Sequence, residues 1–197
     1  MLAALLTVGC GKEGNGTTRI ADDNSRNASA TTPAPGAEID GEMYGAVNGE
    51  RRKWYVAHVE RDGEWQSGSF WRSMSLNNTT QVTIFGLPDK TARPTGKGDV
   101  MISLVVQGES NSPRVISADF TYFADGYTKT WTSEQGGAAN VVLNRFIFDG
   151  EYLDIGGGFS GVVGLPDLEN AATETDAPRQ FEISDGSFAV RIRKLQR

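Results

Sequence analysis

The chain has 197 residues, and its 25 acidic and 19 basic side chains give a formal net charge of −6 at neutral pH. This length suits one domain with a tail, and the acidic balance argues against binding to a nucleic-acid backbone. The single cysteine, Cys10, excludes an internal disulfide and cysteine-rich metal sites, and the single histidine, His58, excludes sites built from several histidines.

Residues 2–10 form an apolar run that ends in a small residue and the cysteine, Leu2-Ala3-Ala4-Leu5-Leu6-Thr7-Val8-Gly9-Cys10. This run resembles the lipobox of bacterial lipoprotein signal peptides, in which the cysteine after the cleavage site receives a diacylglycerol. The resemblance implies that residues 1–9 are a signal peptide and that Cys10 is lipidated. The run is too short for a transmembrane helix, which needs about 20 residues.

Two positions depart from the lipobox pattern. Thr7 stands where the family usually has an aliphatic residue, and no basic residue precedes the apolar run. Signal peptides normally begin with a basic segment, so we expect that the signal is truncated in this sequence. Gly11 follows Cys10 where lipoproteins kept at the inner membrane often have Asp, so the resemblance implies the outer membrane.

The segment that follows the cysteine is polar. Residues 10–37 carry Ile20 as their only large aliphatic side chain and end in a Pro-containing stretch, 31–36. Such a composition cannot bury enough apolar surface to offset the entropy of ordering. We therefore predict a lipidated, disordered linker over 10–37 and a single domain over 38–197.

Short alternating runs broken by turn dipeptides fill residues 38–197. The predicted strands are 42–47, 53–61, 69–76, 81–85, 100–107, 115–123, 127–132, 141–148, 152–155, 159–163, 181–184 and 187–194. The turn dipeptides are Asn48-Gly49, Asp62-Gly63, Asp125-Gly126, Asp149-Gly150 and Asp185-Gly186. No window has a helical period, so the sequence predicts an all-β, antiparallel β-sandwich, with a barrel as the alternative.

Alternation assigns faces within these strands. Ile116, Ala118, Phe120 and Tyr122 are expected on one face of their strand, and Phe188, Val190 and Ile192 on one face of the last strand. The stretches 158–161 and 183–188 resemble the final strands of small β-sandwich domains in uncharacterised bacterial lipoproteins. That family carries no assigned catalytic residues, so the resemblance implies no chemistry.

Glycine-rich stretches match a nucleotide-binding pattern by letters alone. Residues 9–14 and 156–161 both fit Gly-x-Gly-x-x-Gly, but the pattern binds dinucleotides only between a strand and a helix. The first stretch lies in the signal and linker, and the second continues into a predicted strand. We therefore interpret Gly156–Gly158 as a β-bulge or a sheet corner.

The candidates for catalysis and metal binding are few. His58 lies within a predicted strand, which favours a hydrogen-bonded sheet histidine over a catalytic base. Carboxylates flank two turns, at Glu60, Asp62 and Glu64 and at Asp149, Glu151 and Asp154. They are expected on solvated faces, with a carboxylate-based hydrolase as the alternative. The acidic loop 166–178 offers oxygen ligands for calcium but lacks the EF-hand order. Its candidates are Asp167, Glu169, Glu174 and Asp176.

Aromatic side chains are the remaining signal. Trp65 and Trp71 flank a turn-rich stretch and are the candidate ligand-binding residues, because exposed rings suit a sugar face or a protein patch. The alternative is that these residues, like Trp54 and Trp131, belong to the core.

Together these patterns predict a non-catalytic lipoprotein of the bacterial outer membrane that acts by contact. Its expected partners are the membrane, through the lipid on Cys10, and an envelope protein or a glycan, with no nucleic acid and no cofactor. A carbohydrate-binding module that uses Trp65 and Trp71 is the second hypothesis, and the hydrolase is the third.

Overall fold

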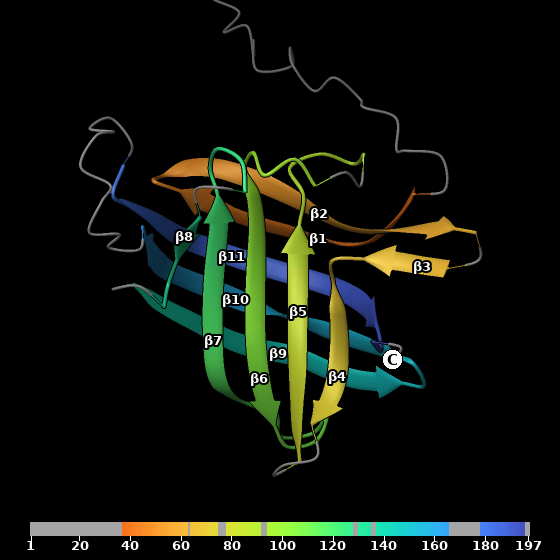
Figure 1. Cartoon of the computed structure of the whole chain (residues 1–197). Coiled ribbons are helices and arrows are strands. Elements are labelled where there is room, and N and C mark those ends of the chain that lie inside the picture. Colours follow the sequence, from red (N-terminus) through yellow and green to blue (C-terminus); the bar gives the residue numbers. More distant parts are fainter. Residues whose placement is uncertain are drawn as a thin grey trace, which may run out of the picture. The chain divides into compact units, whose positions relative to one another are not determined.

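The computed structural model (Figure 1) describes residues 37–62, 64–74, 78–91, 94–127, 130–134, 137–165 and 178–195, except the side chains of residues 61 and 65. Every regular element in these ranges is a β-strand, which confirms the all-β class. The strands are β1 (Ala37–Val47), β2 (Glu50–Arg61), β3 (Glu64–Ser67), β4 (Phe70–Met74), β5 (Thr79–Gly86), β6 (Asp99–Gln107), β7 (Arg114–Phe123), β8 (Trp131–Thr132), β9 (Ala138–Asp149), β10 (Tyr152–Gly164) and β11 (Gln180–Arg193).

These strands form one antiparallel sheet in the order β3-β2-β1-β11-β10-β8-β7-β6-β5-β4, and β9 pairs with β10 beside β8. The two-residue strand β8 joins β10 to β7 and is the place where the sheet folds over. In Figure 1, β4–β7 form one layer that runs crosswise over a second layer of β1, β2 and β9–β11. The strands β3 and β4 end the order without pairing with each other, so the fold is the predicted sandwich and not a closed barrel.

One apolar core fills the space between the layers. Trp54 and Trp131 are buried in it, and each indole N–H donates to a backbone carbonyl, at 2.7 Å to Gly98 and at 2.9 Å to Pro178. A buried aromatic ring of this kind stabilises a fold by roughly 2–3 kcal/mol when its polar atom keeps a partner. The prediction that tryptophans belong to the core is confirmed for these two residues.

The predicted assignment of side chains to the faces of the strands is confirmed with one exception. Phe188, Val190 and Ile192 are all buried, as the alternation predicts. Ile116 is 49% exposed and does not share the buried face of Phe120. The cause is a β-bulge, because Val115 pairs with Val106 and Ser117 with Val105, which leaves Ile116 without an opposite residue.

The turn dipeptides have two outcomes. Asn48 and Gly49, with φ of 50° and 80°, form the predicted hairpin turn between β1 and β2. Asp185-Gly186 was expected to be a hairpin turn, but it lies inside β11. Tyr44 pairs with Ser187 and Ala46 with Ser184. Asp185 and Gly186 therefore form a bulge opposite one residue of β1. The two predicted strands at 181–184 and 187–194 are therefore one strand.

Gly156–Gly158 contain the predicted bulge. The predicted strands 152–155 and 159–163 are one strand, β10, and its register with β9 shifts between Gly156 and Gly157. A Cβ at Gly157 would lie 2.2 Å from the carbonyl oxygen of Val142, so only glycine fits there without a shift of β9.

Candidate ligand-binding site

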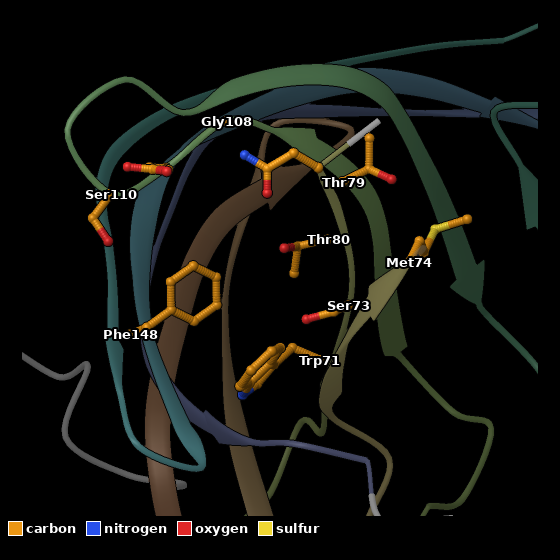
Figure 2. Close-up of a pocket in the computed structure, with 10 residues that line it drawn as sticks. Trp71, Ser73, Met74, Thr79, Thr80, Gly108, Ser110 and Phe148 are labelled. Carbon is orange, nitrogen blue, oxygen red and sulfur yellow. The ribbon is translucent and has the colours of Figure 1, made fainter. Parts of the chain in front are cut away.

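A pocket lies at the ends of β4–β6 (Figure 2), and these strands extend beyond β9 (Figure 1). On the inner face of this layer, Trp71 pairs with Val82, and one row further Ser73 pairs with Thr80. Val82 belongs to the buried core, whereas Ser73 and Thr80 line the pocket. The inner face thus changes from apolar to hydroxyl side chains where the second layer ends.

The apolar wall of the pocket consists of Trp71 and Phe148. Their rings lie 5.0 Å apart at an angle of 57°. Phe148 is 37% exposed, whereas Trp71 is only 5% exposed, so Phe148 presents the apolar surface that a ligand would meet first. Met74 also lines the pocket, but it lies beside Thr79, away from the two rings (Figure 2).

Trp71 is fixed from several directions. Its indole N–H donates to the carbonyl of Glu151 at 3.1 Å, and its carbonyl accepts from the backbone N–H of Leu195 at 2.8 Å. The ammonium of Lys194 lies over its ring, 5.3 Å from the centroid. Trp71 is the rigid back wall of the pocket rather than an open platform for stacking.

The polar side of the pocket comes from two adjacent segments. Asn78 precedes β5, which begins with Thr79 and Thr80, while Gly108, Glu109 and Ser110 follow β6. The backbone N–H of Gly108 donates to the carbonyl of Asn78 at 3.2 Å and joins the two segments. Gly108 has a φ of 99°, a conformation that favours glycine, so this junction depends on it.

The pocket has a volume of about 400 Å³, within the ~300–1,000 Å³ typical of small-molecule sites. Glu109 is the one charged side chain among the described lining residues. Figure 2 shows the rings of Trp71 and Phe148 on adjacent sides of the space, with Ser73 and Thr80 between the strands and Ser110 at the loop. The arrangement offers one apolar wall, one wall of hydroxyl and amide groups, and no cation.

The two predicted tryptophans have different positions. Trp71 lines the pocket but is almost fully buried, so its predicted role as an exposed ring is replaced by that of a buried wall. Trp65 lies in β3, and its side chain lies outside the described part of the structure. Phe148 was not a sequence candidate, although its place one residue before the Asp149-Gly150 turn marks it as the end of an inward-facing row.

His58 is the hydrogen-bonded sheet histidine that the sequence predicts. It is buried in β2, and its Nδ1 lies 2.9 Å from a carboxylate oxygen of Asp40 in β1. Burial raises the pKa of Asp40, and the hydrogen bond and charge of His58 partly offset this effect. The cross-strand neighbour Ser67 donates its hydroxyl to the carbonyl of Ala57 at 3.1 Å and accepts from the backbone N–H of Ser69 at 3.0 Å.

The turn-flanking carboxylates lie on solvated faces, as predicted. Asp154 accepts from Arg145 at 3.2 Å and from Arg191 at 3.3 Å, and Glu151 accepts from Arg193 at 2.9 Å. The other group, Glu60, Asp62 and Glu64, is exposed at the turn between β2 and β3. Exposed ion pairs of this kind contribute little stability, about 0–1 kcal/mol each.

Several predicted positions lie outside the described residues. These are the lipidation site and the calcium candidates, namely Cys10, Asp167, Glu169, Glu174 and Asp176. Within the described ranges, no group of three or more His, Cys, Asp or Glu side chains is placed to hold a metal ion. The same ranges contain no helix long and apolar enough to cross a membrane.

Comparisons of the chain with protein-family models, with curated proteins and with solved structures found no match.

Proposed function

We propose that this chain is a non-catalytic contact protein of the bacterial envelope, tethered to the outer membrane through Cys10, and that the pocket beside Phe148 is its contact site. The observation that carries the proposal is the pocket itself, because it combines partly exposed apolar side chains with hydroxyl groups at the open end of the sandwich. A concave site that combines apolar side chains with a few convergent polar groups is the kind of site at which proteins bind ligands.

Two observations favour contact over catalysis. The imidazole of His58 is buried against Asp40, away from the lining residues of the pocket. Glu109 is the only carboxylate among the described lining residues, whereas hydrolysis of a glycosidic bond normally needs two facing carboxylates about 5–9 Å apart. The hydrolase hypothesis therefore receives no support from this site.

The test fills the pocket with a large side chain and measures which envelope components the immobilised chain retains. Full chain carrying Ser73→Trp is immobilised and exposed to a Gram-negative envelope extract. Ser117→Trp is the matched control, because Ser117 is an exposed strand serine outside the pocket, and heat-denatured wild type is the blank. We expect a component that wild type and Ser117→Trp retain and that Ser73→Trp loses at least about tenfold.

Equal retention by all three folded chains and the blank, or equal retention by the two tryptophan variants, would overturn the contact function of the pocket. Thermal unfolding of each variant shows whether the fold is kept. Because Ser73 is exposed, we expect both variants to unfold near the wild-type temperature.

A further inference from the structure

We propose that the ligand of this pocket is a neutral saccharide, one or two sugar rings long, which packs a C–H face against Phe148 and directs hydroxyl groups to Ser73, Thr80 and Ser110. This inference rests on the proposed function, since it assigns a ligand class to the same pocket.

The apolar wall suits the face of a sugar ring. Sugar C–H bonds carry a small positive charge, and the face of an aromatic ring is negative, so the two attract in addition to burying apolar area. Phe148 is 37% exposed and is held by a tilted contact with Trp71 at 5.0 Å and an edge-to-face contact with Phe146 at 5.1 Å. A ring that is already fixed loses little entropy when a ligand packs on it.

The opposite wall has hydrogen-bonding capacity that the protein leaves unused. In the described part of the chain, the side chains of Ser73, Thr80 and Ser110 form no hydrogen bond with another protein group. Thr80 is only 7% exposed, and Figure 2 shows it and Ser73 beside the cavity. A hydroxyl both donates and accepts, so these residues match the mixed donors and acceptors of a sugar.

Charge selects against anionic ligands. Glu109 is the one charged group among the described lining residues, and it would repel a carboxylate or a phosphate. The nearby cation of Lys194 lies over the Trp71 ring and does not line the pocket. A neutral sugar meets no charge repulsion from Glu109.

An extended peptide fits less well. Peptides that bind beside a strand pair with its free backbone edge, but the edge of β4 at Trp71 is already used. Lys194 forms a parallel bridge with Trp71, and the backbone N–H of Leu195 donates to the Trp71 carbonyl at 2.8 Å. An added strand could therefore pair only with the last residues of β4, whereas a sugar can use the hydroxyl side chains of the pocket.

The test is a titration of ¹⁵N-labelled full chain with N,N′-diacetylchitobiose, cellobiose, maltose and, as the anionic comparison, digalacturonate, followed by amide chemical shifts. We expect at least one neutral disaccharide to shift the amides of Ser73, Thr80 and Phe148. Phe148→Ala should weaken that binding at least about tenfold and Thr80→Val about threefold. Ile147→Ala is the matched control, because Ile147 neighbours Phe148 in β9, is exposed, and lies outside the pocket.

Three results would overturn the saccharide assignment: no neutral disaccharide shifts these amides, Phe148→Ala and Ile147→Ala bind equally, or digalacturonate binds as tightly as the neutral sugars. Failure of the assignment is distinguishable from failure of the contact function. If the disaccharides fail while Ser73→Trp still loses an envelope component, the pocket is a contact site for a protein.

Discussion

Asp40 and His58 form a buried pair between β1 and β2, with 2.9 Å between the carboxylate and the imidazole. Burial disfavours the charged carboxylate, while the hydrogen bond and charge of His58 favour it, and the net result is a raised pKa of Asp40. A group whose pKa is raised on folding gives its full stabilisation below its unfolded pKa and loses it as the pH rises through the folded pKa.

Asp40→Asn should therefore change the pH dependence of stability. Asparagine keeps an oxygen acceptor for His58 but does not ionise, so the variant lacks the loss of stability that wild type suffers as the pH rises above the ordinary Asp pKa of 3.8. We expect the difference in melting temperature to move in favour of Asp40→Asn as the pH rises above 3.8. The measurement is a series of thermal melts of both chains, and parallel curves would contradict the raised pKa.

For single residues, the sequence predicts the kind of environment of a side chain better than it predicts the contacts that the side chain makes. The isolated His58 within an alternating run indicated a sheet histidine, and the structure confirms it. Trp71 was named for its ring, yet Phe148, distant in sequence and on β9, is the side chain that presents an open apolar surface to the pocket. Which of the two rings is exposed to the pocket depends on how β4 packs against β9, and no local sequence pattern encodes that contact.

Glycines in the strands show how an element adjusts to its neighbours. Gly157 lies at the register shift between β9 and β10, where a Cβ would be 2.2 Å from the Val142 carbonyl oxygen. At Gly158, the nearest atom to a Cβ would be the Gly186 carbonyl oxygen at 3.5 Å, which is an ordinary contact.

Gly157→Ala should consequently lower the free energy of unfolding by about 2–4 kcal/mol, because β9 must move away from β10 to accept the methyl group. Gly158→Ala should change it by less than about 1 kcal/mol. Urea unfolding of the full chain measures both values. Equal effects of the two substitutions would show that the bulge tolerates a side chain.

A turn dipeptide forms a hairpin turn only where the pairing of the neighbouring strands allows the chain to reverse. Asn48-Gly49 and Asp185-Gly186 have the same kind of sequence, and both Asn48 and Asp185 have a φ of 50°. The first pair joins two strands, while the second lies where β11 is paired on both sides, to β1 and to β10. Pairing on both sides converts a potential turn into a bulge, and this constraint is not visible in the sequence.

For the whole molecule, the sandwich class followed from alternating runs and turns, but the crossing of the two layers did not. The pocket exists because β4–β6 extend beyond β9, and it brings together residues 71, 73, 74, 78–80, 108–110 and 148. Such long-range juxtapositions depend on the register of every ladder between them. The proposed site could not be assembled from any single stretch of the chain.

The proposed tether is tested by Cys10→Ala. A diacylglycerol adds two chains at about 0.8 kcal/mol for each buried CH₂, enough for stable anchoring. We expect wild type made in its native host to enter the detergent-rich phase of a temperature-induced partition and Cys10→Ala to remain in the aqueous phase. Gly11→Ala is the control, because it alters the neighbouring residue and keeps the thiol. Wild type in the aqueous phase, or Cys10→Ala in the detergent phase, would contradict lipidation at Cys10.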